Sequence, residues 1–483
     1  MANIKQNIFY NVSYRVFQLV LPLVTAPYIS RVLGAKGVGL FSYTNAIASY
    51  FLLFAMLGIS THGVRAIAAV SHQAKDKLYA KFWSLYLGQL IMAVASLSVY
   101  LLIGPLTSAD IEYYLWLPLL ISGAFDCSWY LFGTGEFRIP TLINYLVQLI
   151  TTISIFVFVR TIHDVGCYIV ISSISSFASA LLIAFCVFNK VRIKIVSVSA
   201  ICFELKKSFG LFIPAIAVNV YTSIDKVMLG QLSGMAENGL YTYADKLVSI
   251  ITAVLAAFCT VLLPTMTELY SSRRDDDAFK LLDYSLWIMQ AISWGLFTGL
   301  FVCADTLVPL FLGIEYLACV PALRVLSLRI PILGVTYALG NQFLLPKGFD
   351  NIYTKAVYCG AFVDLALNFV TIRLLGGLGA SISTVLAEAI VLIVEWRFVS
   401  KNTDSIKFFA YLLEYAFVSL MTILFSAGVC YLVACFVDSI LIKLIVNVIS
   451  CLLFYLVLGI MISNRLNNSY IEKLVLNLKV GLK

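Results

Sequence analysis

Long apolar runs separated by short polar gaps make up most of the 483-residue chain. A helix that crosses a bilayer needs about 20 mainly apolar residues, and fourteen segments reach that length. The predicted spans are 12–33, 38–60, 82–104, 113–133, 141–159, 166–188, 209–232, 241–263, 284–304, 320–345, 354–375, 378–399, 412–437 and 444–463. The gaps between them are too short for a separately folded domain. We therefore predict an all-α polytopic membrane protein.

Composition supports this fold class and excludes others. Hydrophobic residues make up 61% of the chain and charged residues 12%, whereas soluble domains have about 45–50% and about 25%. A soluble core cannot hide so much apolar surface. These values exclude a soluble enzyme, a disordered protein and a nucleic-acid-binding module. We expect no nucleic-acid partner.

The positive charges are distributed asymmetrically between the two sides of the predicted helices. With the N-terminus placed in the cytoplasm, the cytoplasmic segments carry 23 lysines and arginines and the opposite side carries five. Cytoplasmic loops of membrane proteins are enriched in these residues. The pattern therefore predicts that both termini are cytoplasmic, and it accounts for the formal charge of +8.

A short sequence repeat relates the two halves of the chain. Residues 39–48 read GLFSYTNAIA, and residues 239–248, which are 200 positions later, read GLYTYADKLV. Each copy follows a proline-bearing helix and a Leu-Gly pair. Six predicted helices separate the starts of the two repeat units, so both copies have the same orientation in the membrane. Transporters are often built from two such halves with the substrate site between them. We predict an N-terminal half at 1–208, a C-terminal half at 209–407 and two further helices with a tail at 408–483.

Two stretches resemble the Wzx-type polysaccharide flippases of the multidrug/oligosaccharidyl-lipid/polysaccharide exporter superfamily. They are NIFYNVSYRVFQLVLPLVTAPYISRVLGAKGVGLFSYTNAIA near the N-terminus and SIDKVMLGQLSGMAENGLYTYADKL in mid-chain. The resemblance implies two six-helix halves in a V shape, related by a parallel repeat, plus two C-terminal helices.

The resemblance also implies a function. The family moves undecaprenyl-diphosphate-linked oligosaccharide repeat units from the cytoplasmic to the outer leaflet for O-antigen, capsule or exopolysaccharide synthesis. This implies a location in the bacterial cytoplasmic (inner) membrane, contact with membrane lipids, and the polysaccharide polymerase and chain-length machinery as partners. A cation-coupled multidrug exporter and a lipid II flippase of the same superfamily stay open as alternatives.

Charged residues inside the predicted helices are the candidate functional groups, because an ionisable side chain at mid-bilayer costs about 2.5–3.5 kcal/mol on insertion scales. The candidate cations for the substrate diphosphate are Arg15, Lys226, Lys246 and Arg329. Arg15 can instead reach the cytoplasmic headgroups, although lipid II flippases carry an arginine at a similar place. Arg324 is also in the tenth span, and Arg329 is the deeper of the two.

Carboxylates in the same helices are candidates for ion coupling or for charge pairing. They are Asp126, Asp225, Asp245, Asp364 and Glu388. Asp126, Asp364 and Glu388 are each expected in mid-helix, where they either neutralise cations or couple transport to H⁺ or Na⁺. Asp225 and Asp245 directly precede Lys226 and Lys246, which allows a cross-helix pair such as Asp225 with Lys246.

Several kinds of chemistry lack a matching motif. The sequence has no GxxxxGK[ST] loop for ATP, and its three histidines and 11 cysteines show no metal-ligand spacing. The outer loops are too short for a polymerase or ligase. We therefore expect no enzyme activity, no cofactor and no metal site.

Overall fold

The computed structural model describes residues 2–104, 110–403 and 408–465, and the side chains of 21–104, 111–213 and most of those from 221 to 462. Within these ranges the chain is almost entirely helical, and no strand is assigned. The contacts divide it into two compact units, Met1–Gly239 and Leu240–Lys483. The units are described separately below.

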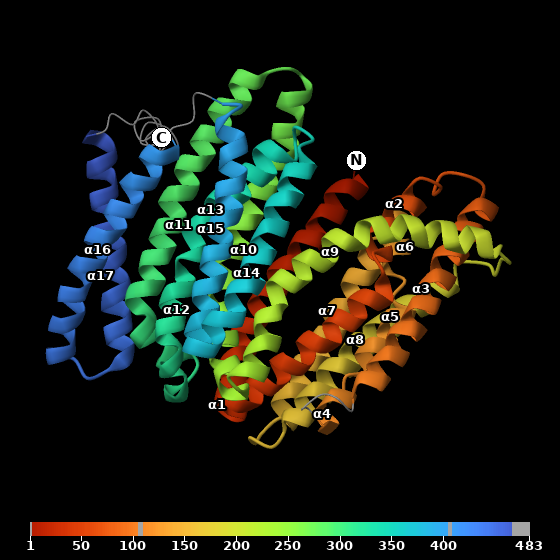
Figure 1. Cartoon of the computed structure of the whole chain (residues 1–483), viewed down its shortest axis with the longest axis horizontal. Coiled ribbons are helices and arrows are strands. Elements are labelled where there is room, and N and C mark those ends of the chain that lie inside the picture. Colours follow the sequence, from red (N-terminus) through yellow and green to blue (C-terminus); the bar gives the residue numbers. More distant parts are fainter. Residues whose placement is uncertain (1, 105–109, 404–407, 466–483) are drawn as a thin grey trace. The chain divides into compact units, whose positions relative to one another are not determined.

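The first unit consists of long and short helices, and the long ones run in alternating directions (Figure 1). They are α1 (Ala2–Met56), α2 (Ile59–Ala68), α3 (Lys75–Ile103), α4 (Asp110–Tyr114), α5 (Leu117–Phe125), α6 (Ser128–Gly133), α7 (Arg138–Phe158), α8 (Val165–Phe188) and α9 (Val198–Leu232). A break at Gly34, where φ is 64°, divides α1 into two helices. The predicted turn between the first two spans is thus a single non-helical residue.

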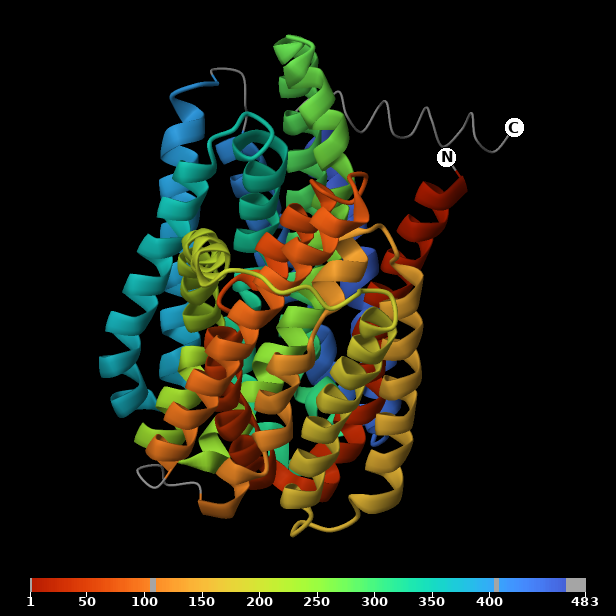
Figure 2. The same cartoon turned by 90° about the vertical axis from the view of Figure 1, so that its right-hand side faces the viewer.

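Helix α9 differs in direction from the rest of its unit. Its first part lies across the other helices of the unit before the chain turns to run along them (Figures 1 and 2). Phe203 and Phe209 are exposed in this part, as are Lys206 and Lys207. Such a mixture of apolar and basic residues is typical of a helix in the membrane interface. The predicted span at 209–232 therefore occupies only the later part of α9.

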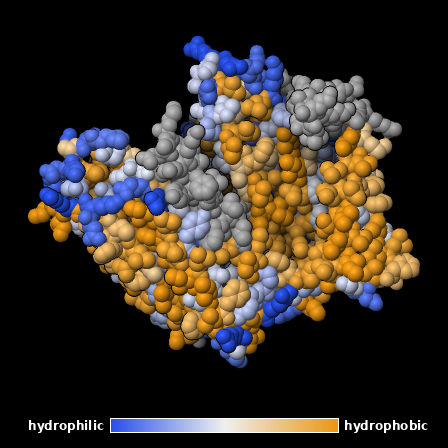
Figure 3. Space-filling model, turned by 180° about the vertical axis from the view of Figure 1, so that it is seen from behind, coloured by the Kyte–Doolittle hydropathy of each residue, from blue (hydrophilic) through white to orange (hydrophobic). Residues whose placement is uncertain are grey.

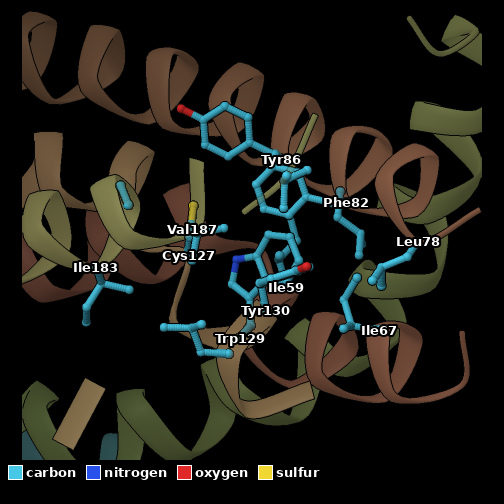
Figure 4. Packing of buried hydrophobic residues seen from close by; sticks show 14 residues of the cluster. Ile59, Ile67, Leu78, Phe82, Tyr86, Cys127, Trp129, Tyr130, Ile183 and Val187 are labelled. Carbon is cyan, nitrogen blue, oxygen red and sulfur yellow. The ribbon is translucent and has the colours of Figure 1, made fainter. Parts of the chain in front are cut away.

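Aromatic residues form the core at one end of the first unit (Figure 4). Phe82 of α3 and Trp129 of α6 are completely buried, and their rings stack with centroids 5.4 Å apart. An added Cβ at Gly63 of α2 would lie 2.8 Å from the Trp129 ring. The glycine therefore lets α2 approach α6, and this contact holds the two helices together.

The second unit begins within α10 (Met235–Ser271). It continues with α11 (Asp275–Phe311), η2 (Ile314–Cys319), α12 (Val320–Ser327), α13 (Arg329–Leu339), the π-helical turn η3 (Gly340–Leu344), α14 (Asp350–Leu375), α15 (Gly377–Ser400), α16 (Phe408–Phe436) and α17 (Ile440–Arg465). Helices α14 and α15 form a close hairpin, in which an added Cβ at Gly379 would lie 2.0 Å from the Thr371 carbonyl oxygen. Helices α16 and α17 pack against α11 through Trp287, Tyr415 and Tyr455.

The tenth predicted span, 320–345, corresponds to the candidate membrane span Ile314–Leu344, which consists of several short helices. The chain there forms α12, α13 and η3, with a break at Leu328 between the first two helices. Pro331 explains this break, because proline has no N–H for the preceding turn and its ring disfavours helical geometry in the residue before it.

The helix lengths confirm the polytopic fold. The described residues contain 12 candidate membrane spans. The first of these, Leu21–Ala68, includes the break at Gly34 and so holds two of the predicted helices. Helix α9 contains the remaining predicted span, which brings the count to the fourteen expected. Orange, apolar residues cover the sides of the helices, and blue, polar residues gather near their ends (Figure 3).

The boundary between the predicted halves stays a prediction, as do the three segments 1–208, 209–407 and 408–483. In the structure α9 packs against α1 and α3, and the first compact unit extends to Gly239. Residues 466–483 of the predicted C-terminal segment are outside the described residues.

Candidate functional site

Three charged residues from three helices meet inside the second unit. Arg329 donates a hydrogen bond from Nε to Oε1 of Glu388 at 2.8 Å and another from Nη1 to Oδ1 of Asp245 at 3.1 Å. The side chain of Glu388 is 3% exposed, and those of Arg329 and Asp245 are each 14% exposed. We call these three residues the arginine cluster.

The backbone around each residue explains how the cluster forms. Arg329 is the first residue of α13, directly after Leu328, which separates it from α12. Glu388 is near the middle of α15, whose neighbouring residues Thr384 and Ala387 are small and buried. Asp245 comes from α10, where Ser249 one turn later donates a hydrogen bond to it at 3.4 Å.

The arginine cluster holds more negative than positive groups. One guanidinium is shared by two carboxylates, and it donates a hydrogen bond to each of them. Charges in a low-dielectric interior are retained only when they are paired. A guanidinium can instead hold an anion by two parallel bonds. The arrangement therefore keeps Arg329 in place while leaving it able to exchange a carboxylate for a stronger anion.

Further acidic and amide side chains lie in the same unit. Asp364 and Asn368 are one turn apart on α14 and are both completely buried. Glu395, two turns beyond Glu388 on α15, is also completely buried. Neither of its carboxylate oxygens has a hydrogen-bond partner among the described residues. The sequence shows Glu395 as a charge within a span, but only its burial marks it as a candidate functional group.

Arg324, the other arginine of the tenth span, has a different environment. It pairs with Asp305 and donates from Nε to the Phe301 carbonyl oxygen at 3.2 Å, with a third of its side chain exposed. These partners are near the end of α11. Arg324 thus stays outside the arginine cluster, and Arg329 is the one that the structure brings together with acidic residues.

The remaining candidate cations are dispersed. Arg15 is within α1, but its side chain is outside the described residues. Lys226 is partly buried in α9, next to the buried Asp225. Lys246 in α10 places its Nζ 5.6 Å from the centre of the Tyr243 ring. Their roles in substrate binding stay predictions.

Asp126 was predicted in mid-helix, and this was wrong. It lies in the break between α5 and α6, where its Oδ1 accepts a hydrogen bond from the Ser128 backbone N–H at 3.0 Å. The completely buried Gln89 donates to the carbonyl oxygens of Gly123 and Asp126, at 2.6 and 3.0 Å. These bonds replace those that a continuous helix would make. Asp126 therefore has a structural role that is visible only in the fold.

The first unit contains a second charged cluster, close to the ends of α2, α3 and α9. Glu204 of α9 receives hydrogen bonds from His62 of α2 and Lys81 of α3, each at 2.7 Å. We call these residues the glutamate cluster. Burial by itself raises the pKa of Glu204, but the hydrogen bonds and charges of His62 and Lys81 outweigh it and lower the pKa to about 2. Glu204 therefore stays ionised and ties α2, α3 and α9 together.

An apolar cavity of about 790 Å³ lies in the second unit. It is lined by residues of α11 and α17, with single contributions from α10 and α16, and its walls include Trp287, Gly295, Gly299, Tyr455 and Gly459. The glycines of α11 and α17 leave space for this cavity between the two helices. The cavity can hold an elongated apolar chain.

Comparison with known proteins identifies the class of this chain. Residues 4–270 match the family described as "Polysaccharide biosynthesis protein". The chain belongs to this family, which confirms its resemblance to the polysaccharide flippases. It is 23% identical over 406 residues, covering 83% of this chain and 97% of the relative, to a protein of Escherichia coli (strain K12) named "Putative O-antigen transporter". A protein of the same name from Shigella dysenteriae is 22% identical, with 77% of this chain and 94% of the relative covered.

Solved structures share the fold. The structure described as "Lipid II flippase MurJ, inward closed conformation" has a TM-score of 0.76 and 16% identity, with 95% of this chain and all of that chain covered. An inward-facing multidrug-resistance MATE transporter of the MOP superfamily has a TM-score of 0.58 and 13% identity, with 80% of this chain and 99% of that chain covered. At these identities the likeness establishes the fold. The chain is a multi-pass membrane protein with the fold of this superfamily.

Proposed function

We propose that this protein is a flippase that carries an undecaprenyl-diphosphate-linked oligosaccharide from the cytoplasmic to the outer leaflet. The observation that carries the proposal is Arg329, a buried arginine that two carboxylates hold inside the membrane-spanning part of the chain. Membership of the polysaccharide biosynthesis family supports the same class of substrate.

The chemistry of the arginine cluster suits a diphosphate. A phosphate group offers oxygens that a guanidinium binds in a bidentate manner. When the substrate enters, it displaces Glu388 or Asp245 from Arg329. The released carboxylate is then a buried negative charge without its cation, which favours uptake of a proton or Na⁺. Substrate binding at Arg329 thus promotes ion binding at the released carboxylate, which couples the two.

Other residues complete the proposed pathway. Arg15, Lys226 and Lys246 would guide the diphosphate before and after it reaches Arg329. Asp225 and Asp364 are buried and would balance these cations or take part in ion coupling. Asp126 accepts a backbone hydrogen bond at the break between α5 and α6, and we assign it no ion-coupling role.

The apolar cavity offers a place for the lipid tail. A polyprenyl chain is long and apolar, and the roughly 790 Å³ between α11 and α17 has the same character. The tail would remain in this cavity and the adjoining bilayer while the sugars and phosphates pass through a polar path. The location in the bacterial cytoplasmic membrane, the cytoplasmic termini and the partnership with a polymerase and chain-length machinery belong to this proposal.

Deletion of the gene tests the proposal. We expect loss of surface polysaccharide, with the complete lipid-linked repeat unit retained on the cytoplasmic face. Complementation with the wild-type chain should restore export, while the Arg329→Ala variant at equal membrane abundance should not. Normal export after deletion would refute the proposal. Rescue of a strain depleted of its lipid II flippase would favour lipid II as the substrate, and rescue of drug efflux would favour the multidrug alternative.

A further inference from the structure

Glu395 is a second buried carboxylate on the same helix as Glu388. The two residues are seven positions apart on α15, and seven residues make almost two full turns, so both side chains leave the helix on the same face. Glu395 is completely buried, and neither of its carboxylate oxygens has a hydrogen-bond partner among the described residues. The steps proposed above assign no role to it.

Close packing keeps Glu395 away from water. Helices α13 and α14 both pack against α15 (Figure 1). An added Cβ at Gly360 of α14 would lie 2.5 Å from Cγ2 of Val391, which is one turn before Glu395. Ala356 of α14 is completely buried. In such surroundings an ionised carboxylate has a high free-energy cost unless a cation or hydrogen-bond donors compensate it.

The cations on α12, α13, α14 and α15 and in the turn before α14 have other partners or positions. Three of them are held by acidic residues: Arg329 binds Glu388 and Asp245, Arg324 binds Asp305, and Lys347 binds Asp275. The other three are exposed: Lys355, Arg373 and Arg397. A proton is therefore the positive charge that fits the carboxylate of Glu395.

One carboxylate and one tyrosine face Glu395. Its electrostatic partners are Glu388 on its own helix and Tyr353 of α14, and Tyr353 interacts with both glutamates. Tyr337 of α13 interacts in the same way with Glu388 and with Tyr353. The other buried carboxylate of this hairpin, Asp364, is about three turns along α14 from Tyr353. Two hydroxyl groups thus accompany the two glutamates.

The tyrosines connect this buried region with its surface. Gly340, the first residue of the π-helical turn η3, makes room for Tyr353, because an added Cβ there would lie 3.0 Å from Cε2 of the ring. Turns of this kind are frequent at functional sites. Tyr337 and Tyr353 are both partly exposed. A proton can therefore pass from the surface to Glu395 through hydroxyl groups.

We propose that Glu395 is a proton-binding site that supplies Glu388 with its proton. The inference rests on the proposed function and deepens it, because it identifies the coupled ion as H⁺. While Glu388 binds Arg329, Glu388 is ionised and Glu395 is protonated. All of these groups belong to the second unit.

The transfer begins when an anionic substrate takes the place of Glu388 on Arg329. The hydroxyl of Tyr353 gives its proton to Glu388, forming an O–H bond there, and regains a proton from Glu395, whose O–H bond breaks. The carboxylate left at Glu395 then takes a proton from a hydronium ion at the partly exposed side of Tyr353. One proton is taken up for each substrate bound, and no group is oxidised or reduced.

The chemistry of Glu395 favours a proton over Na⁺. A metal cation needs several oxygen ligands at once, whereas a proton needs one acceptor oxygen. The oxygens of Glu395 have no hydrogen-bond partner among the residues that the structure describes. Na⁺ is the alternative outcome of the test.

The first measurement compares Glu395→Gln with Glu315→Gln. The amide of glutamine has the shape of a protonated carboxyl group, so we expect folding to be preserved, and Glu315 is an exposed glutamate of η2. Infrared spectra of the purified proteins with isotope-labelled glutamate report protonated carboxyl groups. At neutral pH and without substrate, Glu395→Gln should lose one component of that band, and the control should keep it. An unchanged band in Glu395→Gln would overturn the proposal.

The second measurement follows protons in weakly buffered detergent solution with a pH-indicator dye. The probe is lipid-linked oligosaccharide extracted from the deletion strain. Wild type and Glu315→Gln should take up about one proton per substrate bound, and Glu395→Gln should bind the substrate with no uptake. Binding by the wild type that needs Na⁺ and takes up no proton would overturn the proposal, and this result does not depend on whether Glu395→Gln folds.

Export assays complete the test. Export by Glu395→Gln should lose its pH dependence, and Glu395→Asp, which restores a carboxyl group, should recover part of it. Tyr353→Phe should keep the infrared band and slow the proton uptake. A pH profile of Glu395→Gln that matches the wild type would overturn the proposal. If the protein binds no lipid-linked oligosaccharide but its infrared band depends on Glu395, the proposed substrate fails while the proton site stands.

Discussion

The arginine cluster and the glutamate cluster have opposite designs. In the first, Arg329 is shared by two carboxylates in mid-helix positions. In the second, Glu204 is shared by Lys81 and His62 near the ends of helices. A charge buried in a span has a high free-energy cost and is usually functional. A pair near water has a low cost and can hold helices together. We therefore expect the arginine cluster to serve transport and the glutamate cluster to serve stability.

The largest expected effect comes from Arg329. Replacing it with alanine leaves Glu388 and Asp245 without this cation. We therefore expect transport to be lost and the free energy of unfolding of the purified protein to fall by about 3–5 kcal/mol. Arg329→Lys keeps the charge but not the fork of donors, and should recover stability more than transport. Equal recovery of both would argue against a bidentate contact with phosphate. Export assays and thermal melting in detergent measure the two effects.

The carboxylates of the arginine cluster should give the next largest effect. Glu388→Gln removes a charge with little change in shape, so Arg329 is freed for the substrate but the group that takes up an ion is lost. We expect tighter substrate binding with export slowed by about tenfold and less dependent on pH. Asp305→Asn, which affects the Arg324 pair outside the cluster, is the matched control. If both variants behave alike, the cluster has no special role.

The glutamate cluster should affect stability and leave transport per molecule unchanged. Glu204→Gln weakens the ties from His62 and Lys81, and we expect a loss of about 1–3 kcal/mol. A strong loss of transport in protein that melts like the wild type would contradict the distinction between the two clusters.

Low pH should weaken the interaction of Glu204 with His62 and Lys81. The pKa of Glu204 is lowered from 4.5 to about 2 in the folded protein. Its stabilising contribution is therefore complete above pH 4.5 and is lost as the pH falls toward 2. The difference in melting temperature between the wild type and Glu204→Gln should shrink over that range. A difference that stays constant down to pH 2 would show that His62 and Lys81 do not stabilise the ionised form of Glu204.

The smallest effect is expected at Arg324. Its pair with Asp305 is partly exposed, and exposed pairs contribute about 0–1 kcal/mol. Arg324→Ala should therefore change melting and export only slightly. A loss as large as that of Arg329→Ala would place both arginines in the substrate path.

The sequence by itself determined the fold class, the approximate spans and the set of buried charges. These follow from periodic apolar runs and from the cost of ionising groups in a bilayer, both of which are local properties of the chain. The repeat at 39–48 and 239–248 was equally visible, because identical residues at a fixed offset need no coordinates. The helix break at Asp126 was harder to predict, since it depends on Gln89, which is distant in the sequence.

Only the tertiary structure decided which charges meet. Asp245, Arg329 and Glu388 are 59 to 143 positions apart in the sequence, and no local pattern joins them. The same is true of His62, Lys81 and Glu204. It is also true of Gly39 and Gly239, whose close backbone contact the repeat did not reveal. A charge pair or a backbone crossing is a property of the distance between helices. That distance is set by packing over the whole unit, which a sequence pattern does not contain.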